Sequence, residues 1–134
     1  MKRILMLAVA AVAATTGAVV AAAPAQAAPV GCGSGYFCVY NDINYSYNSG
    51  LYRTAGSDVD WYDNRFPNGK LVARHDSSWF NNGITGPGIP SYTKVFEGKE
   101  HVGAMTICLR AGTGFPRKPA SSDRGGSHLW AFGC

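Results

Sequence analysis

The sequence predicts an all-β domain, built as an antiparallel sandwich. The chain of 134 residues includes 17 Gly and 7 Pro, and after residue 27 no window of ten residues lacks Gly, Pro and Asn while keeping the 3.6-residue period of an amphipathic helix. Apolar and aromatic side chains instead recur in short runs separated by turn-forming residues, which is typical of the strands of a sandwich. The length allows one ordinary domain, and we expect a single fold over residues 28–134.

Six short runs rich in apolar, aromatic and β-branched residues are expected to be strands. In chain order they are Tyr36 to Tyr40, Leu51 to Thr54, Lys70 to Arg74, Tyr92 to Phe96, Val102 to Arg110 and His128 to Phe132. Between them lie clusters of Asn, Gly, Pro and Ser, which tolerate positive φ or fix a turn. Among these turn clusters are Pro67-Asn68-Gly69, Asn81-Asn82-Gly83 and Gly86-Pro87-Gly88.

Residues 1–27 have the pattern of a secretory signal peptide. Lys2 and Arg3 precede an uncharged run rich in Ala and Val, which ends at Ala25-Gln26-Ala27, a small-x-small site of the kind that signal peptidase cuts. A membrane anchor is the alternative, but no basic stop-transfer sequence follows the run. We therefore expect cleavage before Ala28 and a secreted, extracellular domain that makes no membrane contact.

The charge of the secreted domain is nearly balanced. Loss of 2 of the 12 basic residues with the signal peptide leaves 10 against 8 acidic residues, a net charge of +2. These charges are scattered and form no run that would neutralise a phosphate backbone. We expect no nucleic-acid partner, and we expect the domain to be a monomer.

All four cysteines follow the expected cleavage site, where export exposes thiols to oxidation. A domain of this size has a small core, so covalent bridges would stabilise it. Four cysteines allow three connectivities, and pairing within each half of the domain favours Cys32 with Cys38 and Cys108 with Cys134. A structural metal site is disfavoured, because neither a C-x-x-C nor an H-x-x-x-H spacing occurs.

The sequence contains no arrangement of residues that is typical of an enzyme. Ser34 lacks the first glycine of the Gly-x-Ser-x-Gly elbow, and the sequence pairs no two carboxylates across a cleft as a glycosidase requires. The densest acidic cluster, Asp58 to Asp63, includes Trp61 and Tyr62. That cluster is either a sugar- or cation-binding surface or a solvated loop. We expect the protein not to be an enzyme.

Two segments resemble a known family. The segment from Cys32 to Tyr45 contains a close cysteine pair around a Gly-aromatic step, then a strand and a tyrosine-rich turn. The segment from Asp76 to Asn81 contains an aspartate, two serines and an asparagine, and Ser122 to Trp130 is a weaker copy of this pattern. These features resemble peptidase inhibitor family thirty-six, small secreted actinobacterial proteins similar to metalloproteinase inhibitors. The resemblance implies a βγ-crystallin-like fold, in which two Greek keys pack as a sandwich.

In crystallin-like domains, aspartates, asparagines and serines at two corners supply oxygen ligands to Ca²⁺. The residues that the resemblance maps onto the two corners are Asp76, Ser77 and Ser78 in the first and Asp123 and Ser127 in the second. Ala73 and Arg74 stand where the first corner needs an acidic pair, and Gly126 replaces a hydroxyl in the second. We therefore expect no cofactor and weak or absent calcium binding. The alternative role for these side chains is to cap the strand corners through hydrogen bonds to the backbone.

The resemblance implies a secreted inhibitor whose partner is an extracellular peptidase, with metallopeptidases as the expected targets. By position, the expected inhibitory segment runs from Leu109 to Pro119, is rich in Gly and Pro, and is tethered at Cys108. Its candidate inhibitory residues are Leu109, Arg110, Phe115 and Arg117. A surface connection without a partner is the alternative reading of the segment. The alternative function is a secreted crystallin-like binding or structural module without inhibitory activity.

Overall fold

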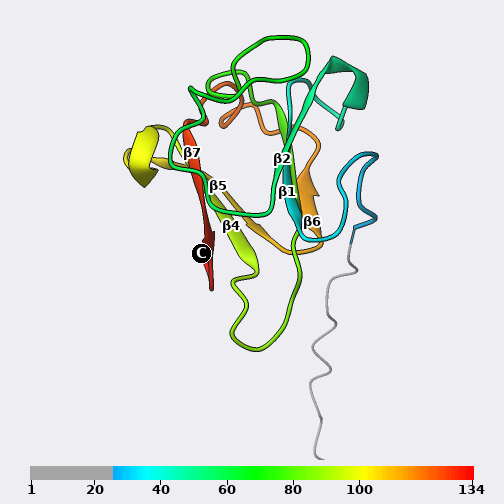
Figure 1. The fold of residues 1–134 in the computed structure, drawn as a ribbon, viewed down its shortest axis with the longest axis vertical. Helices are drawn as coiled ribbons and strands as arrows, with labels where there is room; N and C mark the ends of the chain where they lie inside the picture. The colour runs from blue at the N-terminus through cyan, green and yellow to red at the C-terminus, as the bar shows by residue number, and fades with distance from the viewer. Residues whose placement is uncertain (1–25) are drawn as a thin grey trace, which may run out of the picture.

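Two antiparallel β-sheets pack face to face in the computed structural model, which describes residues 26–134 (Figure 1). The first sheet has the order β2-β1-β3-β6 and the second the order β5-β4-β7. The strands are β1 (Tyr36–Tyr40), β2 (Leu51–Thr54), β3 (Ser78–Asn82), β4 (Tyr92–Phe96), β5 (Met105–Arg110), β6 (Thr113–Phe115) and β7 (Ser127–Ala131), and two short 3₁₀ turns are η1 (Tyr47–Ser49) and η2 (Lys99–His101). The all-β prediction is confirmed. The expected signal peptide lies outside the described residues, except for its last two positions.

The chain uses the same strand arrangement twice. β1 pairs with β2 and β3, and β4 pairs in the same way with β5 and β7. β6 leaves the second unit and pairs with β3 of the first. Its counterpart is the isolated bridge of Asp58 to His128, which joins the first unit to β7. The two units are therefore interlocked Greek keys, each of which lends one short segment to the sheet of the other.

A serine at the start of each unit's last strand closes the turn that follows its first strand. Ser78 Oγ donates to the carbonyl of Asp42 at 2.7 Å and accepts from the amide of Tyr45 at 3.1 Å. The corresponding partners of Ser127 are the carbonyl of Gly98 at 2.6 Å and the amide of His101 at 3.1 Å. Tyr45 and His101 both have positive φ, 54° and 60°. The serine hydroxyls thus hold two turns in a conformation that costs a non-glycine residue free energy.

The core lies between the sheets and is dominated by large apolar side chains. Its buried members are Phe37, Val39 and Trp79 from the first sheet, Val95, Ile107 and Leu109 from the second, and Trp61, Phe66, Val72 and Ala73 from the loops. A second cluster of Tyr40 and Phe80 surrounds the buried disulfide of Cys32 and Cys38. Both sheets contribute to the main core, so the two Greek keys share one core rather than two.

Both disulfides have the connectivity expected from the sequence. Cys32 is bonded to Cys38 and Cys108 to Cys134. The second bridge ties the end of the chain, beyond β7, to β5, on the opposite edge of the same sheet. Within residues 26–134, we find no helix with the length and apolar character needed to cross a bilayer.

Three strand predictions require correction. Residues 70–74 form no strand, because this segment hydrogen-bonds to the loop before it, through Val72 N to Asn64 O at 3.0 Å and Ala73 N to Trp61 O at 3.2 Å. The sequence Asn81-Asn82-Gly83 predicts a turn, but both asparagines lie in β3, within the sheet. β6 was also missed, since Gly and Thr dominate its three residues.

Candidate functional site

The segment predicted to be the inhibitory loop, residues 109–119, begins inside the second sheet. Leu109 lies in β5, is 3% exposed and belongs to the main core. The chain then reverses at Gly112, with φ of 77°, and enters β6. The side chain of the candidate inhibitory residue Leu109 is therefore not exposed to a partner in this fold, because it fills the space between the two sheets.

The other three predicted residues of this segment lie on its surface. Phe115 in β6 is half-buried, and the Lys118 ammonium lies 4.9 Å from the centre of its ring. Arg110 and Arg117 are exposed. The basic residues of this segment therefore lie on β5 and on the segment after β6, and not on a projecting loop.

The connection between β3 and β4, which we call the 83–91 loop, does project from the sandwich (Figure 1). Residues 84–89 are all exposed, and the side chains of Ile84 and Ile89 are 58% and 42% exposed. No charged residue or histidine occurs between Ser77 and Thr93. The loop therefore presents two aliphatic side chains in an uncharged segment.

The tip of this loop is a type II β-turn. The amide of Ile89 donates to the carbonyl of Gly86 at 3.1 Å, and Gly88 has φ of 73°. Proline at the second position and glycine at the third are the residues that this turn favours, because proline fixes φ and glycine accepts a positive φ. Gly86-Pro87-Gly88 thus fixes the shape of the tip by local chemistry alone.

A fully buried amide holds the base of the 83–91 loop. Asn81 Oδ1 accepts from the amide of Gly83 at 2.8 Å, and Asn81 Nδ2 donates to the carbonyls of Ser91 at 3.2 Å and Leu109 at 2.9 Å. Its backbone carbonyl accepts from Gly112 N at 2.7 Å. One side chain therefore joins the two ends of the loop to each other and to β5.

The neighbouring asparagine holds a second loop, which is closed by the first disulfide. Asn82 Nδ2 donates to the carbonyl of Cys32 at 2.8 Å, and Asn82 O accepts from the amide of Gly35 at 2.7 Å. The two loops border a surface pocket of about 580 Å³. Its lining includes Gly35, Tyr36, Ala55, Ile84, Ile89 and Trp130.

A tryptophan packs on the start of the 83–91 loop. A Cβ atom placed on Gly83 would lie 2.5 Å from the Trp130 ring and 2.8 Å from Asn81 Oδ1. Only glycine fits between this ring and the amide. The loop therefore leaves the sheet through a tightly packed exit.

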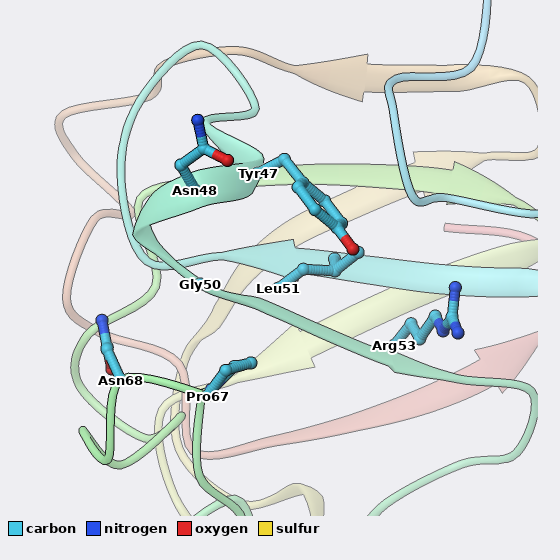
Figure 2. Close-up of a pocket in the computed structure, with 7 residues that line it drawn as sticks. All are labelled: Tyr47, Asn48, Gly50, Leu51, Arg53, Pro67 and Asn68. Atoms are coloured by element: carbon cyan, nitrogen blue, oxygen red, sulfur yellow. The ribbon is translucent and has the colours of Figure 1, made fainter.

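A second, more polar pocket of about 430 Å³ lies beside η1 and β2. Figure 2 shows Tyr47 and Leu51 on one side of it and Pro67 and Asn68 on the other. Asn48, Gly50 and Arg53 complete the lining. Arg53 Nη1 donates to the carbonyl of Gly31 at 3.0 Å, which fixes the direction of the guanidinium group.

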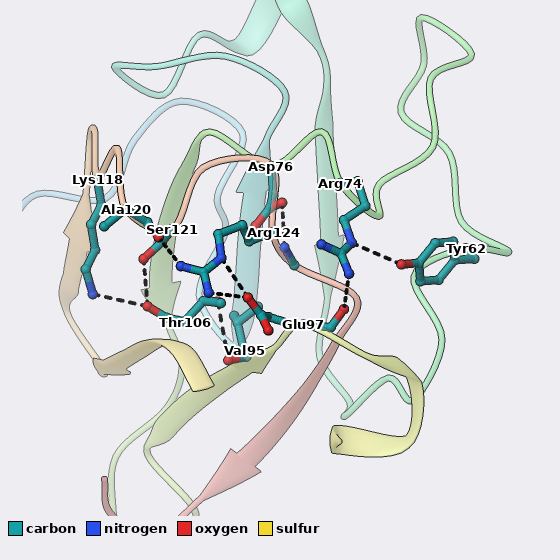
Figure 3. Close-up of polar contacts among 11 residues, drawn as sticks. Tyr62, Arg74, Asp76, Val95, Glu97, Thr106, Lys118, Ala120, Ser121 and Arg124 are labelled. Atoms are coloured by element: carbon teal, nitrogen blue, oxygen red, sulfur yellow. Dashed lines mark hydrogen bonds and ion pairs between the residues drawn. The ribbon is translucent and has the colours of Figure 1, made fainter. Parts of the chain in front are cut away.

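The two predicted corners lie against each other (Figure 3). Arg74 N donates to the carbonyl of Gly125 at 2.9 Å, and Asp123 N donates in the same way to the carbonyl of Asp76 at 2.8 Å. Arg74 and Asp123 hold equivalent places, and both have positive φ, 64° and 58°. The corners are thus joined by a reciprocal pair of backbone hydrogen bonds.

Charged side chains surround this junction. Arg124 forms an ion pair with Glu97 and donates from Nη1 to the carbonyl of Ala120 at 2.6 Å. Arg74 donates from Nη2 to the carbonyl of Glu97 at 3.3 Å and from Nε to the hydroxyl of Tyr62 at 3.1 Å. Two guanidinium groups beside the corners oppose the approach of a cation.

The carboxylate of Asp76 is buried and already has two donors. Oδ2 accepts from Trp79 Nε1 at 3.0 Å, and Oδ1 accepts from Gly125 N at 2.9 Å. Burial raises the pKa of Asp76 to about 7, although both hydrogen bonds act in the opposite direction. Asp76 therefore links the two Greek keys from inside the protein. Ser77 is half-buried beside it.

His128 is a second buried titratable group, and burial shifts its pKa in the direction opposite to that of Asp76. His128 Nδ1 accepts from Trp61 Nε1 at 2.8 Å, so the proton lies on Nε2, which donates to the carbonyl of Gly56 at 2.8 Å. Burial lowers the pKa of His128 to about 4. The imidazole is therefore neutral in the folded protein at ordinary pH.

These two groups predict opposite pH dependences of stability. The raised pKa of Asp76 stabilises the fold at low pH, and this contribution is lost as pH rises from about 4 to about 7. The lowered pKa of His128 stabilises the fold above about 6.5, and this contribution is lost as pH falls towards 4. Between pH 4 and pH 6.5 the two effects cancel.

Single variants should expose the two slopes. Relative to the unmodified protein, the free energy of unfolding of Asp76→Asn should increase with pH by about 1.4 kcal/mol per unit between pH 4 and pH 6.5, because only His128 remains. His128→Gln should show a relative decrease of the same size. Urea unfolding across this range measures both, and parallel curves for all three proteins would contradict the assignment.

The acidic cluster from Asp58 to Asp63 does not form a sugar-binding surface. Trp61, which would stack on a sugar, is completely buried. Asp58 accepts hydrogen bonds from the Tyr52 hydroxyl and from Asn64 Nδ2, and Asp60 pairs with Lys99. Within residues 26–134, no three His, Cys, Asp or Glu side chains are arranged to hold a metal ion.

Sequence reasoning missed the two asparagines that hold the loops. In the sequence, Asn81-Asn82-Gly83 reads as a turn, and only the fold reveals which carbonyls the amides reach. The uncharged run from Ser77 to Thr93 is the one signal that marks this segment in the sequence.

Comparison with solved structures supports the fold. One similar structure is described by the words "Evolution of the eye lens beta-gamma-crystallin domain fold"; it is 14% identical, with a TM-score of 0.54, and the match covers 72% of this chain and 84% of the other. Another is a nickel complex of a clostrillin double mutant, 16% identical, with a TM-score of 0.49, over 70% of this chain and 94% of the other. The first likeness shows a βγ-crystallin fold. No curated protein matches the sequence.

A protein-family comparison identifies the lineage of the chain. The sequence matches the model of peptidase inhibitor family I36 over residues 25–108, which is more than half of the chain. The matched range contains the first Greek key, both asparagines of β3 and the whole 83–91 loop. The chain belongs to peptidase inhibitor family I36.

Proposed function

We propose that this protein is a secreted inhibitor of metallopeptidases and that the 83–91 loop contacts the enzyme. Family membership supports inhibition of a peptidase. The observation that carries the choice of surface is the buried amide of Asn81, which fixes both ends of an exposed, uncharged loop. A loop that is already held in its bound shape loses little conformational entropy when a partner binds.

The composition of the loop supports an enzyme with an apolar specificity pocket. Peptidases that select Lys or Arg need a cationic side chain, and the loop has none. Ile84 and Ile89 each expose an aliphatic side chain that suits such a pocket. The basic surface formed by Arg110 and Arg117 lies on β5 and the segment after β6 and is the alternative contact.

The proposal is tested with the purified domain and a panel of metallo-, serine and cysteine peptidases. We expect inhibition of a metallopeptidase that prefers aliphatic side chains. Replacement of Ile84 and Ile89 together by alanine should weaken this inhibition at least about tenfold, since a buried interface anchor contributes more than about 1–2 kcal/mol.

Two matched variants serve as controls. Val59 and Val102 are 51% and 59% exposed and lie outside the loop, so alanine at both removes comparable apolar surface elsewhere. Arg110→Ala with Arg117→Ala tests the basic surface. Unchanged inhibition by the isoleucine variant, combined with loss in the arginine variant, would move the contact to β5 and the segment after β6.

The polar pocket beside η1 favours a second candidate function, a binding module. Tyr47 is 53% exposed, and Asn48 and Arg53 supply donors around it. An aromatic face with amide and guanidinium donors suits a small polyhydroxylated ligand. Calorimetric titration with neutral and acidic oligosaccharides would detect this binding independently of inhibition. Binding by the unmodified domain that is lost in Tyr47→Ala would assign the site to this pocket.

We also propose that neither crystallin-like corner binds calcium. Asp76 uses both carboxylate oxygens for N–H donors, and Ser78 and Ser127 use their hydroxyls to close turns. Arg74 and Arg124 add positive charge at the junction. Calorimetric titration with Ca²⁺ should show no saturable heat.

A further inference from the structure

Building on the proposed function, we infer that Ile84 is the residue that enters the specificity pocket of the peptidase, and that the Gly83–Ile84 peptide bond is the bond presented to its catalytic centre. The observations that single out this position concern the prolines of the loop, the contacts of its two isoleucines and the free hydrogen-bonding groups at its start.

The prolines exclude the second half of the loop. Peptidases bind a substrate segment in extended form through its backbone N–H and C=O groups. Gly86–Pro87 and Ile89–Pro90 are imide bonds without an N–H, and residues 86–89 are closed into a hydrogen-bonded turn. Residues 83–85 contain no proline and continue directly from β3.

The two isoleucines differ in what they touch. Ile89 folds over its own turn: its Cδ1 atom would lie 3.2 Å from a Cβ placed on Gly86. Ile84 is the more exposed of the two. Its Cδ1 atom lies near Gly35 of the disulfide loop, 3.8 Å from the point where a Cβ on Gly35 would be. Ile84 can therefore leave the surface of this protein without disturbing the turn.

The backbone at this position is available to a partner. None of the hydrogen bonds found within residues 26–134 uses the carbonyl of Gly83 or the amide of Ile84. The backbone N–H of Gly83, which precedes this peptide bond, donates to Asn81 Oδ1. An enzyme would thus meet a free carbonyl and a free N–H on a backbone whose direction is already set.

The same contacts explain why cleavage would be slow. In hydrolysis, the water oxygen adds to the carbonyl carbon of Gly83, the C–N bond to Ile84 breaks, and the proton passes to the Ile84 nitrogen, leaving a carboxylate and an amine. The Trp130 ring packs against the Cα atom of Gly83, and Asn81 holds both Gly83 and Ser91. After cleavage, Gly83 stays held on one side of the cut and Ser91 on the other, so the fold keeps the two fragments associated and the bond can re-form.

The inference is tested by single variants and by the position of the cut. Against a peptidase that the unmodified domain inhibits, Ile84→Ala should raise the inhibition constant at least about tenfold and Ile89→Ala less than about threefold. Ile84→Val should restore most of the loss, and Val102→Ala should change nothing. Melting temperatures identify any variant that is misfolded.

Prolonged incubation with the peptidase should give a product whose new amino terminus reads Ile84-Thr85-Gly86. Because each disulfide lies wholly on one side of this bond, the two fragments should separate on a denaturing gel without a reductant. Unchanged inhibition by Ile84→Ala, or a cut at any other bond, overturns the inference while inhibition itself stands. Failure of the unmodified domain to inhibit any peptidase of the panel would instead contradict the proposed function.

Discussion

Replacement of Asn81 by aspartate should reduce the free energy of unfolding by at least about 3 kcal/mol. The side chain is completely buried, and its NH₂ group is the donor for the carbonyls of Ser91 and Leu109. Aspartate offers no donor, so both carbonyls lose this hydrogen bond, although the carbonyl of Ser91 keeps its bond from Ala111 N at 2.7 Å. The larger cost is the buried charge, which aspartate places among acceptor oxygens without a donor to compensate it. Urea unfolding measures the loss.

Asn48→Asp is the matched control, because Asn48 is an exposed amide in η1 and surface substitutions rarely change stability by more than about 0.5 kcal/mol. In conditions where the Asn81 variant remains folded, amide exchange of Ala111, which donates to the carbonyl of Ser91 at 2.7 Å, should accelerate. A change in stability below about 1 kcal/mol would mean that the amide is not the main support of the loop base.

Removal of the Cys108–Cys134 bridge should cost about 3–4 kcal/mol. The bonded residues are 26 positions apart, and a closed loop of this length restricts the unfolded chain by roughly that amount. Cys134 is exposed and Cys108 half-buried, so replacement of both by serine leaves little cavity and isolates the effect of the cross-link. Chemical denaturation of the double variant gives the value.

The other bridge provides the comparison. Cys32 and Cys38 are 6 positions apart, and loop closure there accounts for about 2 kcal/mol. Both of these cysteines are buried, so their replacement also removes packing and tests a different contribution. If the Cys108 and Cys134 variant were as stable as the parent protein, the end of the chain beyond β7 would be held by its packing alone.

The strands that were predicted with correct bounds are those with regular apolar patterns. β1, β2 and β4 begin and end at the residues expected from Tyr36 to Tyr40, Leu51 to Thr54 and Tyr92 to Phe96. β3 was missed because Asn81 and Asn82 favour turns locally, whereas in the fold their amides find distant carbonyls. Such long-range partners leave no mark in a local pattern.

The internal repeat was partly visible in the sequence. The rings of Tyr40 and Tyr45 pack edge to face with their centres 5.6 Å apart, and the rings of Phe96 and His101, with the same spacing along the chain, are in contact at 5.8 Å. Two residues after the second ring, the first unit has Tyr47 and the second has Gly103. Recognition of this second hairpin would have predicted two equivalent keys.

The candidate site was predicted less well than the fold. Leu109 was included in the inhibitory segment because the glycines that follow it suggest exposure, although the expected strand from Val102 to Arg110 already contained it. The fold places its side chain in the core. The sequence of the 83–91 loop marks a turn at Gly86-Pro87-Gly88 without showing that the turn stands on a rigid base. Rigidity here comes from Asn81, Asn82 and Trp130, which only the folded chain brings together.

The most direct test of the central claim is the inhibition constant of a variant in which residues 84–89 are replaced by a Gly/Ser segment of equal length. All six residues are exposed and the contacts of Asn81 lie outside them, so the melting temperature should stay close to that of the parent. Our account predicts that inhibition of the susceptible metallopeptidase falls by at least about a hundredfold. Undiminished inhibition by this folded variant would contradict the claim that the loop is the inhibitory surface.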